Sequence, residues 1–112
     1  MNNKIEIKNQ FVDNLSLILN NSLIDEITDI LNSVEEGKKV YQNFADFFRS
    51  ALRDYINGEF KMSSEKRRTG IKRTTSLRVD QNILNFYNSI PKGKRSDWLE
   101  RILEAYMKEK LY

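Results

Sequence analysis

The sequence predicts a mainly α fold with a short two-stranded antiparallel β-ribbon, contributed by two strand-helix-helix segments in tandem. The clearer segment lies in the C-terminal half, where Thr75, Leu77 and Val79 alternate with polar residues. Such period-two alternation is typical of a half-buried strand. Amphipathic helical patterns follow it, and the same order of patterns occurs in the N-terminal half. We therefore expect two similar segments whose strands pair into one ribbon.

Two amphipathic helices are expected after the C-terminal strand. Asp80 stands where a helix N-cap belongs, and Pro91 ends the first helix. Ser96 is expected to cap the second helix. The apolar residues recur at helical spacing: Ile83, Leu84, Tyr87 and Ile90, then Trp98, Leu99, Ile102, Leu103 and Tyr106. Aromatic residues at this spacing are interpreted as core rather than as base-stacking platforms, and the same holds for Phe44, Phe47, Phe48 and Tyr55.

The N-terminal half repeats this order in a weaker form. Leu15, Leu17 and Leu19 form its strand, and residues 20–22 its cap region. Asn43 with Asp46 is a capping pair for its second helix, and Gly58 is a C-terminal stop. Any two amphipathic hairpins would overlay in this way, but the recurrence of strand, cap and both helices in order favours a duplication.

A second interpretation of this half stays open. Lys4–Lys8 also alternates between polar and apolar residues, so it is a candidate first strand. A helix would then begin near Asn9, and three helices would precede the linker.

The charges divide the chain into parts with different expected roles. Residues 1–60 carry six Lys/Arg and ten Asp/Glu, whereas residues 61–112 carry thirteen and six. The predicted parts are an acidic N-terminal unit (1–58), a basic linker (59–72) and a C-terminal unit (73–112). A basic half indicates nucleic acid or another anionic surface as partner. The linker has two interpretations: a solvated flexible tether, or an arm that sets Lys61, Lys66, Arg67, Arg68 and Lys72 against phosphates.

The composition excludes several kinds of chemistry. The chain contains neither Cys nor His, so it has no conventional zinc site, thiolate nucleophile or histidine base. Its carboxylates are scattered through helical patterns rather than paired, so we expect no enzymatic activity, no cofactor and no small-molecule substrate. There is no apolar run long enough to span a bilayer and no secretory signal, so we expect no membrane partner and a cytoplasmic location.

The order strand, helix, basic turn, helix over residues 73–110 resembles the ribbon-helix-helix family of DNA-binding transcription regulators. Residues 13–58 resemble it more weakly. The resemblance implies that two units pair, with four helices beneath a ribbon that enters the major groove of double-stranded operator DNA. A single-chain tandem is similar to small regulators of archaeal viruses, which implies the host cytoplasm as location. The family most often represses transcription; activation, and a homo-oligomer on DNA, stay open.

The resemblance also assigns the contacts to DNA. Base contacts fall on the outward positions of the strands: Thr74, Ser76 and Arg78, with Asn14 and Ser16. Arginine suits guanine, asparagine suits adenine, and hydroxyls bond to either. Ile18 stands where the other strand has Arg78, so we expect a chemically unequal ribbon. Phosphate contacts fall on Lys72 and Arg73, and on the N-terminus of the last helix at Lys94, Arg95 and Ser96.

Two other functions stay open from the sequence. In one, the C-terminal unit pairs between chains, and the N-terminal half binds a protein partner, as in an antitoxin. In the other, the chain is a helical protein–protein adaptor with a basic tail. The first requires dimerisation for folding, and the second predicts no preference for any DNA sequence.

Overall fold

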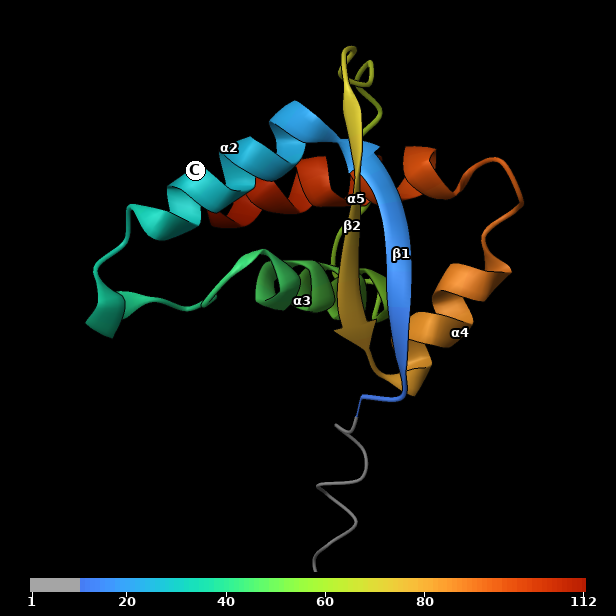
Figure 1. Ribbon diagram of the computed structural model, residues 1–112, viewed down its shortest axis with the longest axis horizontal. Helices are drawn as coiled ribbons and strands as arrows, with labels where there is room; N and C mark the ends of the chain where they lie inside the picture. Colours follow the sequence, from blue (N-terminus) through green and yellow to red (C-terminus); the bar gives the residue numbers. More distant parts are fainter. Residues whose placement is uncertain (1–10) are drawn as a thin grey trace, which may run out of the picture.

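The computed structural model describes residues 11–112, and this part of the chain is mainly helical with one two-stranded antiparallel sheet (Figure 1). The order strand, helix, helix occurs twice, as the sequence predicts. The elements are β1 (Asp13–Asn20), α2 (Asn21–Asn32), the 3-10 helix η1 (Glu36–Lys38), α3 (Phe44–Ile56), β2 (Lys72–Val79), α4 (Gln81–Ser89) and α5 (Arg95–Lys110). None of the described helices is long and apolar enough to cross a membrane.

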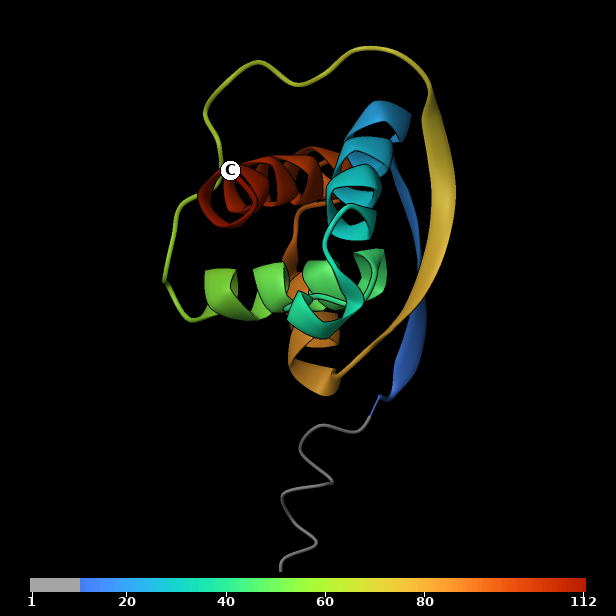
Figure 2. The same cartoon turned by 90° about the vertical axis from the view of Figure 1, so that its left-hand side faces the viewer.

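The two strands pair within one chain, in a register that sets Ser16 opposite Ser76. Apart from the exposed Ile18, the apolar side chains of both strands lie on one face and pack on the helices. Figure 2 shows the ribbon along one side of the molecule and the helices on the other, so that residues 11–112 cover only one face of the sheet. The covered face contains Leu15, Leu17, Leu19, Leu77 and Val79, all buried.

The strand that pairs with β2 is Asp13–Asn20, so these residues do not belong to the helix that the second interpretation starts near Asn9. That part of the second interpretation is wrong. Leu15, Leu17 and Leu19 are 7%, 2% and 0% exposed, because extended backbone turns all three toward the helices. A helix would distribute them around its surface. The candidate strand Lys4–Lys8 lies outside the described residues.

Side-chain caps start three of the four described α-helices. The side-chain oxygen of Asn20 accepts from the Leu23 N–H at 3.1 Å, and Asp80 accepts from the Ile83 N–H at 3.0 Å. Asn43 accepts from the Asp46 N–H at 2.9 Å. These caps agree with the sequence predictions, and each stabilises its helix by about 1 kcal/mol. After α3, Gly58 adopts a φ of 77°, the left-handed conformation expected of a glycine stop.

The core lies between the ribbon and the helices, with α3 and α5 at its centre. Phe47 and Phe48 of α3 and Ile102 and Leu103 of α5 are fully buried. The prediction that the helical aromatic residues form core is confirmed: Tyr106 is also buried, and Phe44, Tyr55 and Trp98 pack against the same cluster. Tyr41, which the helical pattern does not include, joins them through the Phe47 ring at 5.2 Å between centroids.

Each half of the chain supplies a group that holds the start of a helix in the other half. The carboxylate of Glu100 in α5 accepts the backbone N–H of Asn20, the cap of α2, at 2.9 Å. Arg53 in α3 donates to the carboxylate of Asp80, the cap of α4, at 3.2 Å. Glu100 binds the backbone of its cap residue, whereas Arg53 binds the side chain of its cap residue. The halves therefore interlock through polar contacts as well as through the shared core.

Candidate nucleic-acid interface

The outer face of the ribbon presents six side chains as three cross-strand pairs. They alternate with the buried apolar residues, so they point away from the helices. All six are exposed. The pairs are Asn14 with Arg78, Ser16 with Ser76, and Ile18 with Thr74. The structure thus gathers the five residues assigned to base contact from the sequence on one continuous surface and adds Ile18 to them.

The dimensions of this surface suit a DNA groove. Each strand has eight residues, which extend over about 27 Å. The strands of a ribbon lie about 4.8 Å apart, and the major groove of B-DNA, about 12 Å wide, admits a ribbon of this width. Since the helices all lie behind the ribbon (Figure 2), none of them blocks the approach of its outer face.

Arg78 lies at one end of this face, where no described residue holds its guanidinium in an ion pair. Its carbon Cζ lies 5.7 Å from the centroid of the Phe11 ring. Arg49 stacks more closely on the same ring, at 4.6 Å, and donates to the backbone carbonyl of Arg78 at 2.8 Å. Asp46 neutralises Arg49 at 2.8 Å. Within residues 11–112, Arg78 is therefore the cation at this end that has no acidic partner.

The two strand residues assigned to phosphate contact are already engaged inside the protein. The ammonium of Lys72 lies 3.3 Å from the buried carboxylate of Glu100. The guanidinium of Arg73 lies 3.2 Å from Asp25 and also donates to Asn21. A phosphate would have to compete with these partners, so Lys72 and Arg73 are weaker candidates than the sequence pattern indicates.

Unpaired positive charge gathers instead at the turn between α4 and α5. Lys92, Lys94 and Arg95 form no ion pair with residues 11–112. Lys92 and Lys94 are exposed. Arg95 stacks on the Tyr87 ring, with 4.4 Å from its Cζ to the ring centroid. This turn is the part of the described chain, apart from Arg78 and two linker lysines, where cations lack an acidic partner.

Ser96 does not cap α5, contrary to the sequence prediction. Gly93, with a φ of 83°, closes a turn in which the Lys94 N–H donates to the Pro91 carbonyl at 3.0 Å. The helix therefore begins at Arg95, and Lys94 takes the N-cap position without a side-chain bond. The hydroxyl of Ser96 donates to the Ile18 carbonyl of β1 at 2.6 Å. Ser96 thus attaches the basic turn to the ribbon at the end opposite Arg78.

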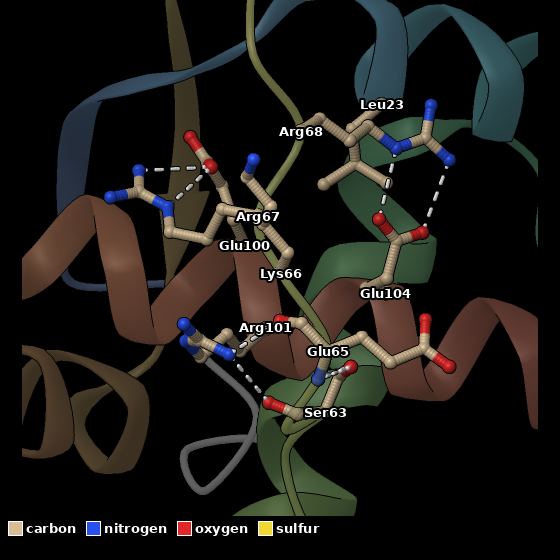
Figure 3. Close-up of a pocket in the computed structure, with 9 residues that line it drawn as sticks. All are labelled: Leu23, Ser63, Glu65, Lys66, Arg67, Arg68, Glu100, Arg101 and Glu104. Carbon is tan, nitrogen blue, oxygen red and sulfur yellow. Dashed lines mark hydrogen bonds and ion pairs between the residues drawn. The ribbon is translucent and has the colours of Figure 1, made fainter.

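The linker lies on the helices rather than extending into solvent, as the close-up in Figure 3 shows. Arg67 pairs with Glu100 at 2.9 Å, and Arg68 pairs with Glu104 at 2.9 Å and with Glu26. The hydrogen bond to Glu104, with Glu26 adding to it, raises the pKa of Arg68. Neither sequence interpretation, flexible tether or phosphate arm, describes these two arginines. Lys61 and Lys66 are exposed and form no ion pair with residues 11–112.

Sequence reasoning missed the ion-paired state of much of the basic half. It also missed Phe11 and Arg49 beside Arg78. No local pattern signals these contacts, because the partners lie far apart in the chain and meet only through the strand pairing and the docking of α3.

The described residues contain no cluster of acidic side chains that could hold a metal ion. Comparison with protein-family models, with curated proteins and with solved structures yields no match to the chain.

Proposed function

We propose that the protein is a sequence-specific regulator of transcription that binds double-stranded DNA by inserting its ribbon into the major groove. The observation that carries the proposal is the exposed outer face, where Asn14, Ser16, Thr74, Ser76 and Arg78 stand in cross-strand register. Amide, hydroxyl and guanidinium groups are those that read base edges. A ribbon whose polar side chains only faced water would not require these groups to be aligned over a surface as long as a DNA groove contact.

The tandem organisation supports two ribbon-helix-helix units acting as one pseudo-dimer. A two-stranded ribbon alone is barely stable, and a unit of about forty residues buries too little surface to fold alone. Here β1 and β2 pair within the chain, and Glu100 and Arg53 hold the cap residues of the opposite halves. Linking the units in one chain gives each a high effective concentration of the other.

Double-stranded DNA fits this surface better than other nucleic acids do. The major groove of A-form RNA is deep and too narrow for protein elements. Single-strand binders use exposed aromatic side chains as stacking platforms. In this protein Phe47, Phe48 and Tyr106 are buried in the core, and the outer face of the ribbon carries no aromatic residue. The proposal therefore names duplex DNA as the ligand.

The test is selection of bound duplexes from a random-sequence pool, combined with sedimentation of the protein in dilute solution. We expect a folded monomer and an enriched sequence that remains bound in excess non-specific DNA. Affinity should fall with salt, with a log–log slope of about −0.9 per phosphate contacted. Salt-dependent binding without any enriched sequence would contradict the proposal and favour a basic adaptor. A chain that folds only as a dimer would contradict the intrachain pseudo-dimer.

A further inference from the structure

We infer that the ribbon reads a non-palindromic site, with purines recognised at one end and thymine methyl groups at the other. This inference rests on the proposed function. The midpoint of the ribbon is the pair Ser16–Ser76. A twofold rotation about that midpoint, which superimposes each strand on the other, would bring Asn14 onto Thr74 and Ile18 onto Arg78. A homodimer would have identical residues at these positions, whereas here the two ends differ.

One end can form a dense set of hydrogen bonds. Asn14 lies directly opposite Arg78, and both are exposed. Directly opposite residues have Cβ atoms about 5 Å apart, so the two side chains reach neighbouring base pairs. Arginine bonds in a bidentate manner to O6 and N7 of guanine, and asparagine to N6 and N7 of adenine. This end should select adjacent guanine and adenine.

The opposite end cannot read bases in this way. Ile18 is 55% exposed on the outer face and has no hydrogen-bonding group. Its cross-strand neighbour Thr74 adds a methyl group and one hydroxyl. Apolar contact with the C5-methyl of thymine is the readout available to such a pair. This end should therefore select thymine.

The hydrogen bond from Ser96 to the Ile18 carbonyl fixes this end against α5. The backbone of Ile18 is thereby held in place, while its side chain is exposed on the outer face. The apolar end is a positioned part of the reading face rather than a frayed strand end.

The experiment compares selected sites of the wild type with those of a double variant, Ile18→Arg with Thr74→Asn, in which both ends carry Asn and Arg. The wild type should enrich a non-palindromic site. The double variant should enrich an inverted repeat of the guanine–adenine half and prefer it to the wild-type site by at least about fivefold, the lower value of one bidentate contact. Both positions are exposed, and circular dichroism checks that the variant folds.

A second measurement uses the site that the wild type has already selected and requires no new selection experiment. Thymines in the apolar half are replaced one at a time by uracil, which lacks only the methyl group. At a contacted position the wild type should lose about fourfold in affinity, the value of one buried methylene. The Ile18→Ala variant should be insensitive to the same replacement.

The outcomes separate the two proposals. An inverted repeat enriched by the wild type would overturn this inference and leave the proposed DNA-binding function standing. No enriched sequence would overturn both. A non-palindromic site whose uracil substitutions have no effect would overturn the role of Ile18.

Discussion

Removal of the Glu100 carboxylate should destabilise the protein far more than loss of a surface acid on the same helix. Glu100 is 4% exposed and accepts from the Asn20 N–H at 2.9 Å, from Arg67 at 2.9 Å and from Lys72 at 3.3 Å. In Glu100→Ala the Asn20 N–H stays buried without an acceptor, which costs about 1–3 kcal/mol.

The ion pairs add less. The Arg67 and Lys72 side chains are 31% and 37% exposed, so both regain water when Glu100 is removed. Each pair is then worth about 0–1 kcal/mol. The expected loss in free energy of unfolding is about 3 kcal/mol, or roughly 12 °C in melting temperature at about 4 °C per kcal/mol for a domain of this size.

Thermal and urea unfolding followed by circular dichroism measures this loss. Glu109→Ala is the matched control, because its side chain is 52% exposed and its nearest cation, Lys110, lies at 4.0 Å. That variant should stay within about 0.5 kcal/mol of the wild type. Glu100→Gln keeps an acceptor for Asn20 and should lose roughly 1 kcal/mol. A Glu100→Ala variant as stable as the control, or a Gln variant as unstable as the Ala variant, would refute this reasoning.

Three further outcomes are expected. Arg78→Ala should weaken binding to the selected site by about 1–3 kcal/mol and relax specificity at one base pair. Lys94→Ala should instead weaken binding to all sequences alike and lower the slope of log affinity against log salt by about 1. Equal losses of affinity for the two variants on every sequence in DNA titrations would exclude direct readout by Arg78. Asp80→Ala should cost about 1–2 kcal/mol in urea unfolding through loss of the α4 cap, whereas Asn82→Ala, exposed in the same helix, should be neutral. Burial, with hydrogen bonds to Tyr41 and Asp54, raises the pKa of Tyr106 above 10.0. The stability that its neutral form provides is therefore present below pH 10.0 and lost as the pH rises above it. Tyr106→Phe should lack that alkaline loss, and parallel curves of unfolding free energy against pH for the two proteins would contradict the expectation.

Much of the positive charge of the C-terminal half is paired within the protein, which its composition does not indicate. Thirteen Lys/Arg against six acids indicates an anionic partner. In the folded protein Arg67 and Arg68 of the linker and Lys72 and Arg73 of β2 contact acids on α2 and α5. Much of the apparent DNA-binding charge therefore stabilises the fold. Among the described residues, the cations near the ribbon that lack an acidic partner are Arg78 at one end and those of the α4–α5 turn at the other.

The order of elements and the two faces of each strand were determined by the sequence itself, because both follow from local periodicity. Alternating apolar residues turn to one side of any extended chain, and Asn20, Asn43 and Asp80 cap helices through bonds to residues three positions on. Which residues stand opposite one another was decided by the tertiary structure. The register that sets Asn14 beside Arg78 and Ile18 beside Thr74, and the carboxylates that hold the linker, join residues some thirty to eighty positions apart. Such contacts form only when the two halves pack together, and no local pattern in either half encodes them.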